Sequence, residues 1–240
     1  MNVKQTLVMT LLAISVSLNA DQAEETSMIA SFNWAVSQSN GGSYGEPEKM
    51  FEVIDYSHLI GMPGFSDKAL KAHFKLYAGY VKNTNLLLQQ FRKMIEEGEL
   101  SGPVFNELNR RFGWEFDGMR LHELYFENLG GNGELDKNQT LYRLIARDFG
   151  SFENWKKDFK ATGLIRGIGW VILYQDPRTG RLMNVWINEH DTGHLSGTNP
   201  ILVMDVWEHA YLFDYALDRD AYIDNFIKNI KWSESLKRFH

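Results

Sequence analysis

The 240-residue sequence contains no cysteine, which removes several kinds of chemistry at once. No disulfide can stabilise the fold, no thiolate can act as a nucleophile, and any metal ion must be held by nitrogen and oxygen donors. Imidazole and carboxylate donors suit iron, manganese or zinc. The chemistry open to the chain is therefore that of histidine and carboxylate side chains, with or without a metal.

Positive charge is also scarce, because 25 Lys and Arg stand against 31 Asp and Glu, for a formal net charge of −6. No basic stripe with interleaved aromatic residues is present, so we expect no binding to nucleic acid. An anionic substrate would find no overall attraction, and local Lys or Arg side chains at the site would have to supply it. Neither a P-loop nor a dinucleotide-binding glycine motif occurs.

One short apolar run lies at the N-terminus, between Thr6 and Leu18. Lys4 precedes it and Ala20 follows it, a pattern typical of a secretory signal, and the run is too short for a convincing membrane span. We expect residues 1–20 to be a signal peptide, the protein to be exported to the periplasm or secreted, and no stable membrane association after signal removal. An uncleaved N-terminal anchor is the alternative.

The rest of the chain is rich enough in apolar and aromatic residues, 44% and 13%, to bury a core. Residues 21–49, with a Ser- and Gly-rich stretch, read as an N-terminal extension or linker. Apolar residues then recur at helical spacing over 65–97, where Ser66 is a candidate cap, and over 104–129, with an interruption near Gly113. A polar break at 98–103 would join these helices as a hairpin.

A glycine-rich linker at 130–133 predicts a domain boundary. Two helices and three strands are expected beyond it, at residues 139–149, 151–162, 167–174, 181–188 and 199–204. The predicted fold class is α+β. An N-terminal α-helical hairpin domain (50–130) would be followed by a C-terminal α/β domain (131–240) with a three-stranded antiparallel sheet.

The most informative stretch is Asp-Val-Trp-Glu-His-Ala-Tyr, which begins at Asp205. If a helix starts near Asp205, that residue and His209 project from one side of it, four residues apart, and can converge on one metal ion. The alternative is an ordinary helix start, in which the helix dipole favours the Asp205 carboxylate and His209 is a core histidine whose ring nitrogens are hydrogen-bonded.

This stretch resembles the C-terminal signature of the iron/manganese superoxide dismutases, and the resemblance can be followed back to about residue 55. Downstream it continues through Tyr211, Tyr215, Arg219, Tyr222 and Trp232. It implies one Fe or Mn ion per chain with superoxide as substrate, and a homodimer. The metal ligands that it implies are His73, His122, Asp205 and His209.

The resemblance also implies roles around the metal. Tyr80 and His190 would relay protons to bound solvent, Glu208 would reach across a dimer interface to the partner's His209, and Tyr211 would reach toward the partner's gateway tyrosine. Tyr80 is the expected gateway tyrosine, the tyrosine at the entrance to the metal site, and Tyr77 is the alternative. Tyr80 lies seven residues after His73, which is about 700° around a helix, so a straight helix would still point both into one site.

Three further positions bear on the metal and on the site mouth. Gly118 together with His190 slightly favours iron, or tolerance of both metals. Arg219 matches an arginine near the family's site entrance, where it could attract an anion, or else it forms a salt bridge with Asp218 or Asp220. His194, next to a glycine, is expected to be a surface residue.

Three departures from the family pattern keep other functions open, since Tyr77 occupies the family's second-histidine position, Leu121 replaces an Asn and Ile172 replaces the second Trp of a Gly-x-Gly-Trp-x-Trp strand. The leading hypothesis is an exported superoxide dismutase. A relative without catalysis that serves as a binding or structural subunit is the second hypothesis, and a different oxidation at the same ligands is the third.

Overall fold

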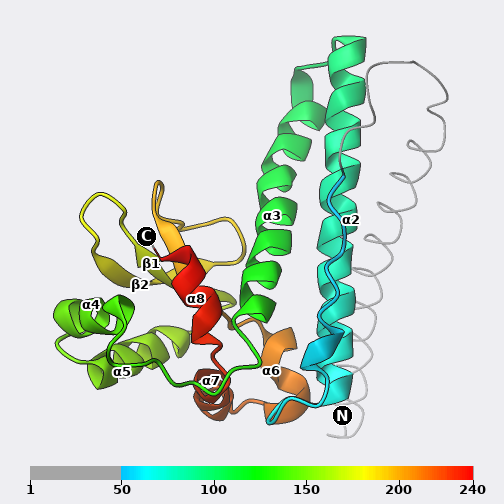
Figure 1. The fold of residues 1–240 in the computed structure, drawn as a ribbon. Helices are drawn as coiled ribbons and strands as arrows, with labels where there is room; N and C mark the ends of the chain where they lie inside the picture. Colours follow the sequence, from blue (N-terminus) through cyan, green and yellow to red (C-terminus); the bar gives the residue numbers. More distant parts are fainter. Residues whose placement is uncertain (1–49, 240) are drawn as a thin grey trace, which may run out of the picture. The chain divides into compact units, whose positions relative to one another are not determined.

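The computed structural model describes residues 50–239, and two long antiparallel helices are the first α-helices of this part of the chain (Figure 1). The expected signal peptide and extension lie outside this range. Helix α2 (Asp67–Glu97) starts where the sequence predicts, because the Ser66 side chain accepts a hydrogen bond from the Ala69 N–H at 3.1 Å. Helix α3 (Gly102–Glu127) continues through Gly113, so the interruption expected there is wrong. A single helical glycine costs only about 1 kcal/mol relative to alanine.

The expected helical hairpin and three-stranded antiparallel sheet are both present, which confirms the predicted fold class. A short 3-10 turn, η1 (Ser57–Leu59), precedes the hairpin. The elements after it are α4 (Thr140–Phe149), α5 (Phe152–Gly163), β1 (Gly169–Gln175), β2 (Leu182–Asn188), β3 (Asn199–Asp205), α6 (Glu208–Tyr215), α7 (Arg219–Lys228) and α8 (Trp232–Arg238). The domain division near residue 130 stays a prediction.

The sheet has the strand order β2-β1-β3, and the central strand β1 is buried along its whole length. Trp170 pairs with Ile187 on one side and with Asp205 on the other. Gly169, at φ +153°, permits the close approach of β2, since a Cβ there would lie 2.0 Å from the Ile187 carbonyl oxygen. This register places the end of β3, and with it Asp205, directly beside Trp170.

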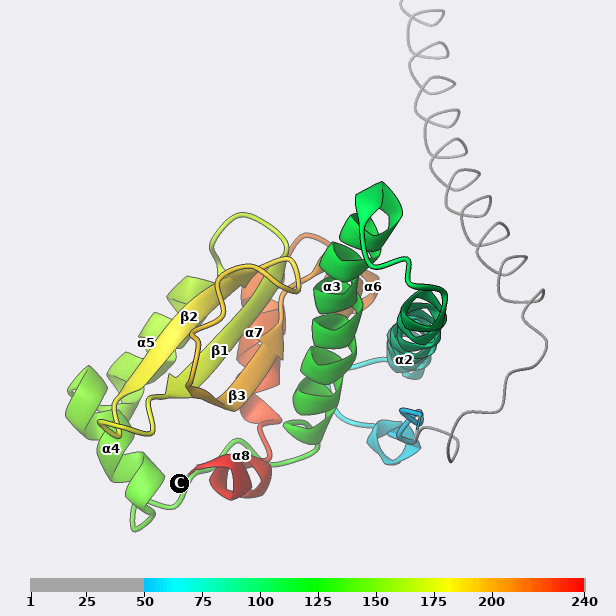
Figure 2. The ribbon, with the colours of Figure 1, turned by 90° about the horizontal axis from the view of Figure 1, so that it is seen from above.

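Helices cover the sheet, with α5 packed against β1 and β2 and with α3 and α8 packed against β3 (Figure 2). Helix α6 contacts α2. The helix expected to start at Asp205 begins instead at Glu208, so Asp205 is the last residue of β3 and His209 lies in the first turn of α6. The expected helical spacing of Asp205 and His209 is therefore wrong, and a strand–turn–helix connection brings the two together.

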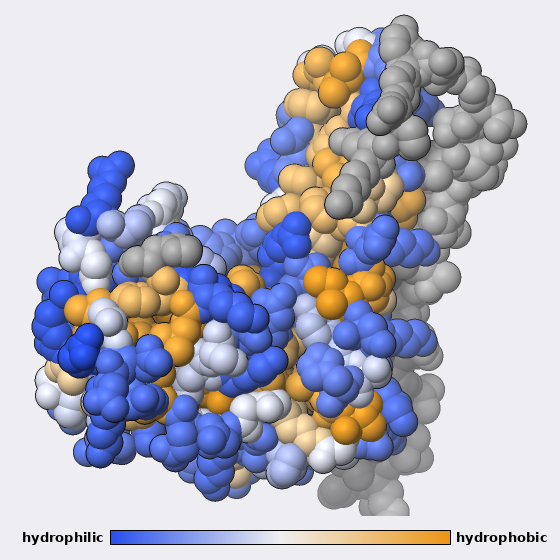
Figure 3. All heavy atoms as spheres, viewed as in Figure 1, coloured by the Kyte–Doolittle hydropathy of each residue, from blue (hydrophilic) through white to orange (hydrophobic). Residues whose placement is uncertain are grey.

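The visible surface is mostly polar around the sheet, whereas apolar atoms gather along the upper part of the α2–α3 hairpin (Figure 3). Exposed apolar side chains at the helix ends there are Ile95, Leu100 and Val104. Within residues 50–239, no helix combines the length and apolar character that crossing a membrane requires.

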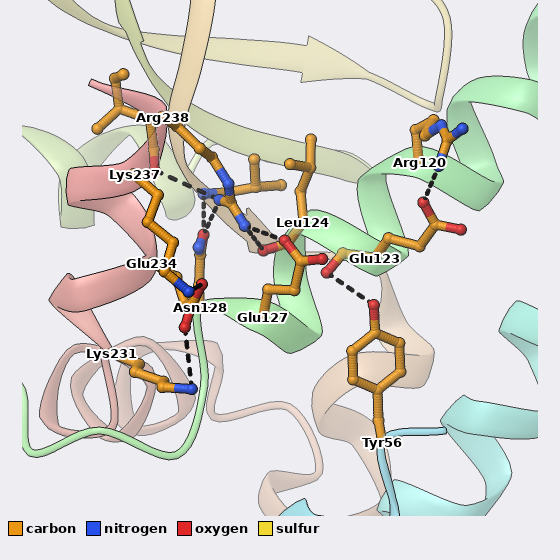
Figure 4. Close-up of polar contacts among 12 residues, drawn as sticks. Tyr56, Arg120, Glu123, Leu124, Glu127, Asn128, Lys231, Glu234, Lys237 and Arg238 are labelled. Carbon is orange, nitrogen blue, oxygen red and sulfur yellow. Dashed lines mark hydrogen bonds and ion pairs between the residues drawn. The ribbon is translucent and has the colours of Figure 1, made fainter. Parts of the chain in front are cut away.

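The C-terminal helix is fastened to the end of α3 by Arg238 (Figure 4). Its guanidinium donates to Asn128 Oδ1 at 3.0 Å, to Glu127 Oε2 at 2.6 Å and to the Leu124 carbonyl at 3.4 Å. Asn128 Oδ1 also accepts from the backbone N–H of Val203 in β3 at 3.1 Å. The buried amide of Asn128 therefore joins α3, β3 and α8. Of these elements, α3 carries His122 and β3 carries Asp205.

We expect Arg238→Ala to lower the free energy of unfolding by about 2 kcal/mol, because it removes charge-assisted hydrogen bonds in a largely buried setting. Urea denaturation measures the effect. Lys237→Ala is the matched control, since Lys237 is exposed and pairs with Glu234, an interaction worth about 1 kcal/mol or less. Equal losses in the two variants would contradict the fastening role.

Candidate metal centre

Four potential ligands come from four elements and meet at one point. His73 lies on α2, His122 on α3, Asp205 at the end of β3 and His209 in α6. One ligand atom from each lies within 4.8 Å of all the others. Asp205 Oδ2 is central, at 3.2 Å from His73 Nε2, 3.1 Å from His209 Nε2 and 3.8 Å from His122 Nε2. The structure thus brings together all four residues expected to be ligands.

Two of these side chains are oriented by hydrogen bonds on the side away from the centre. His122 Nδ1 lies 2.5 Å from the Gly118 carbonyl oxygen, which can only accept, so Nδ1 carries the proton and Nε2 faces the centre with its lone pair. Asp205 Oδ1 accepts from the backbone N–H of Trp207 at 2.8 Å, which leaves Oδ2 pointing inward. Such outer contacts are how proteins fix ligand orientation.

The protonation states also suit metal binding. Burial lowers the pKa of His73, and it lowers the pKa of His122 well below the usual value, with the nearby His73 adding to the effect. Burial raises the pKa of Asp205, but the charge and hydrogen bond of His209 and the close approach of His73 outweigh it, so the net pKa is lowered. Neutral imidazoles and an ionised carboxylate are the forms that coordinate metals.

The donor set is incomplete without a cation. Among the described residues, His73 Nε2 and His122 Nε2 are buried and have no hydrogen-bond partner, although both lie at the centre. Buried nitrogen atoms normally find a partner, and leaving one unsatisfied costs about 1–3 kcal/mol. A metal ion at this point would satisfy both lone pairs and the carboxylate charge together. The residues therefore fit a metal held by three imidazoles and one carboxylate.

A tyrosine–histidine pair lies beside the ligands. Tyr80 Oη is 2.7 Å from His190 Nε2, and the Tyr80 ring centroid is 5.2 Å from that of His122. Trp170 Nε1–H donates to His190 Nδ1 at 3.1 Å. Because the indole can only donate, Nδ1 is the acceptor, so in the neutral ring Nε2 carries the proton and donates to the Tyr80 oxygen. Burial lowers the pKa of His190 to about 4, which keeps the ring neutral.

Comparison with known proteins agrees with this geometry. The family described as "Iron/manganese superoxide dismutases, C-terminal domain" matches residues 137–238. An iron superoxide dismutase of Cupriavidus metallidurans is 39% identical over 183 residues, which cover 74% of this chain and 90% of that protein. The chain belongs to the iron/manganese superoxide dismutase family.

Other relatives differ in the metal that their names give. "Superoxide dismutase [Mn] 1" of Halobacterium salinarum is 39% identical over 190 residues, covering 78% of this chain and 92% of that protein. "Superoxide dismutase [Mn/Fe]" of Aeropyrum pernix is 31% identical over 196 residues, covering 79% and 91%. Family membership therefore supports iron or manganese without choosing between them.

The two candidate gateway tyrosines, Tyr77 and Tyr80, have different hydrogen-bond partners in the structure. Tyr77 is fully buried and its hydroxyl donates to Glu123 Oε1 at 2.9 Å while it accepts from the Ile54 N–H at 3.2 Å. Its hydroxyl is therefore engaged with Glu123 and Ile54, and Tyr80 is the tyrosine whose hydroxyl meets His190.

Trp114 lies beside the candidate metal centre, and the sequence analysis did not predict it. Its ring centroid lies 4.8 Å from that of His190 and 6.0 Å from that of Trp207, while the Trp207 ring stacks on His190 at 4.7 Å. The available signal was its position eight residues before His122, about two helical turns along the same helix. Trp114 and Trp207 together shield the His190 ring.

Glu208, Tyr211 and Arg219 lie outside the ligand cluster. Glu208 is exposed at the start of α6. The Arg219 guanidinium donates to the Tyr211 hydroxyl at 3.1 Å and to the carbonyls of Ile165 and Gly167 at 2.9 and 2.8 Å. Arg219 is thus held by backbone carbonyls and Tyr211 rather than by the carboxylates that the sequence offered as an alternative.

His194 is not the simple surface residue that its loop setting suggested. It is half-buried, and its Nε2 lies 2.7 Å from the carbonyl oxygen of His190. Its Nδ1 lies 2.7 Å from the Tyr174 hydroxyl. A glycine-flanked histidine looks solvent-exposed in sequence, because the partners that bury it lie on a distant strand.

Proposed function

We propose that the chain is a superoxide dismutase that converts superoxide to hydrogen peroxide and oxygen at one iron or manganese ion held by His73, His122, Asp205 and His209. The convergence of these four donors carries the proposal, because two buried Nε2 atoms lack a hydrogen-bond partner among the described residues. Membership of the family, with relatives named as iron and manganese superoxide dismutases, supports the same assignment. When bound, the ion would accept an electron from one superoxide and return it to a second.

The residues of the chain would manage the protons, since forming one peroxide from two superoxide ions consumes two. His190 Nε2–H donates to the Tyr80 oxygen, so the Tyr80 hydroxyl is held in place to pass its own proton toward a reactant at the centre, and a proton from solvent restores it. The neutral His190 ring, with Nδ1 fixed by Trp170, keeps this direction of the hydrogen bond to Tyr80. Trp114 and Trp207 pack against the buried His190 ring and keep bulk water from it, while Tyr80 stays partly exposed.

The test is elemental analysis of the purified protein alongside a superoxide-consumption assay on the same sample. We expect about one iron or manganese per chain, given the single four-donor cluster among residues 50–239, and activity in proportion to metal content. We favour iron or the use of either metal, on the basis of Gly118 and His190. Metal without activity would indicate a different oxidation, and neither metal nor activity would indicate a binding or structural subunit.

A homodimer is proposed on the surface around α6. Glu208 is exposed, His209 is partly exposed, and Leu212 and Phe213 expose apolar side chains in the same helix. A second copy could bury this surface and bring Glu208 to the partner's His209, with Tyr211 nearby. Export is proposed separately, on the pattern of residues 1–20, and N-terminal sequencing of the mature protein tests it.

We expect Glu208→Ala to weaken the dimer by about tenfold or more, because the ring N–H of the partner's His209 would lose its acceptor in the buried interface. Sedimentation velocity over a concentration series measures the dissociation. Glu153→Ala, which removes an exposed carboxylate on α5, is the matched control and should leave the dimer unchanged. An unchanged dissociation profile in Glu208→Ala would contradict the interface role.

A further inference from the structure

His190 lies in a tight loop with an unusual backbone. Glu189, just before it, has φ +55°, a left-handed conformation that non-glycine residues seldom adopt. Asn188 and Thr192 exchange backbone hydrogen bonds of 2.9 and 3.3 Å and close the loop. Such a conformation persists only where the surroundings hold it. The contacts of this loop therefore decide where the His190 ring lies.

One of those contacts comes from His194. A backbone carbonyl can only accept, so His194 Nε2 must donate in its 2.7 Å contact with the His190 oxygen. In the neutral imidazole Nδ1 is then an acceptor, and the Tyr174 hydroxyl donates to it at 2.7 Å. Burial, with Asp117 nearby, raises the pKa of Tyr174, so it stays a donor. A directed chain of hydrogen bonds thus runs from β1 through His194 to the His190 backbone.

The space behind this chain is open. A cavity of about 230 Å³ is bordered by both Tyr174 and His194. Its other polar lining residues are Asp117, Arg120 and Thr198. The Asp117 carboxylate lies 3.7 Å from His194 Nε2, Arg120 pairs with Glu123, and the Thr198 hydroxyl donates to the Leu195 carbonyl at 2.6 Å. The remaining walls are apolar, including Ile172. The loop could therefore relax toward the cavity if the His194 contact were lost.

We propose that His194, fixed by Tyr174, is a positioning residue that sets the His190 loop and thereby the hydrogen bond between His190 and Tyr80. The inference rests on the proposed function for its effect on catalysis. His194 touches neither the four ligands nor Tyr80, so its influence passes through the His190 backbone. A displacement of about 1 Å in such a group can cost as much as a hundredfold in rate.

The test compares four variants of the metal-loaded protein. His194→Ala removes the donor, whereas His194→Gln keeps an N–H near the position of Nε2. Tyr174→Phe removes only the hydroxyl that fixes the His194 ring. His58→Ala, at an exposed histidine in η1, is the control. We expect His194→Ala to retain its metal while kcat falls about tenfold or more, with Tyr174→Phe intermediate and His194→Gln and the control near the parent.

Two readouts separate positioning from a general loss of structure. Imidazole in solution should restore activity to His194→Ala, because the substitution adds its own space to an existing cavity. Crystal structures should show the 2.7 Å contact between Tyr80 Oη and His190 Nε2 kept in the parent and His194→Gln but lengthened in His194→Ala. If the parent consumes no superoxide, the proposed function fails, and the structures still decide the positioning.

Either of two results would overturn the proposal. One is parental activity and an unchanged Tyr80–His190 contact in His194→Ala. The other is an equal loss in His194→Ala and His194→Gln with no response to imidazole, which would assign His194 a purely structural role. If both His194 variants fail to fold, Tyr174→Phe decides alone, since an unmoved His190 in that variant would also overturn the proposal.

Discussion

Asp205→Ala is expected to abolish metal binding and superoxide consumption together. The carboxylate is fully buried and its Oδ2 lies within 3.2 Å of both His73 Nε2 and His209 Nε2, so it supplies the single negative charge that holds a cation among the four donors. Removing even an outer partner of a metal ligand typically costs 10–100-fold in affinity or activity. We therefore expect a loss of about a hundredfold or more, measured as metal per chain and as superoxide consumption.

His122→Ala tests the same ligand set from another element. Its Nε2 has no hydrogen-bond partner among the described residues, so the substitution removes an unsatisfied atom and should cost activity and metal without breaking a hydrogen bond at that nitrogen. His58→Ala provides the control for loss of a histidine. Activity that persists in either ligand variant would contradict the ligand assignment, whereas a folded protein without metal would support it.

The helical hairpin and the sheet could be predicted because their signals are local. Ser66 caps α2, Gly98 ends it in a left-handed conformation at φ +72°, and glycine marks the close approach of β1 and β2 at Gly169. The four donors were predicted by family resemblance. The geometric reason first given for Asp205 and His209 was wrong, because the hydrogen bond from the Trp207 N–H turns the chain before α6 begins.

Trp114 and His194 could not be predicted from local pattern, because each acquires its role from residues far along the chain. Trp114 matters only because His190 and Trp207 are brought against it. His194 is buried by Tyr174, 20 residues earlier on the central strand. Tyr77 and Tyr80 illustrate the same limit. Both lie on α2 within one turn, and only the fold shows that the Tyr77 hydroxyl contacts Glu123 whereas the Tyr80 hydroxyl contacts His190.

Gly118→Ala is expected to separate catalysis from metal binding. A Cβ at Gly118 would lie 2.6 Å from Tyr80 Cδ1 and 3.0 Å from Tyr80 Cγ, too close for the ring to stay in place. Tyr80 must move, and its contact with His190 Nε2 must lengthen, although no ligand is altered. We expect activity per bound metal to fall about tenfold to a hundredfold, since a misplaced proton-transfer group can cost this much.

Gly113→Ala on the same helix is the matched control, because a Cβ there meets nothing within 4 Å. Alanine is the better helix former by about 1 kcal/mol, so this variant should be more stable than the parent and equally active. Gly118→Ala gains the same helix propensity, but the clash with Tyr80 opposes it. If Gly118→Ala keeps full activity per metal, the Tyr80 ring can shift without loss of catalysis. That result would contradict a requirement for the Tyr80–His190 contact. If it loses metal as well, the disturbance has reached His122 through the Gly118 carbonyl that orients it.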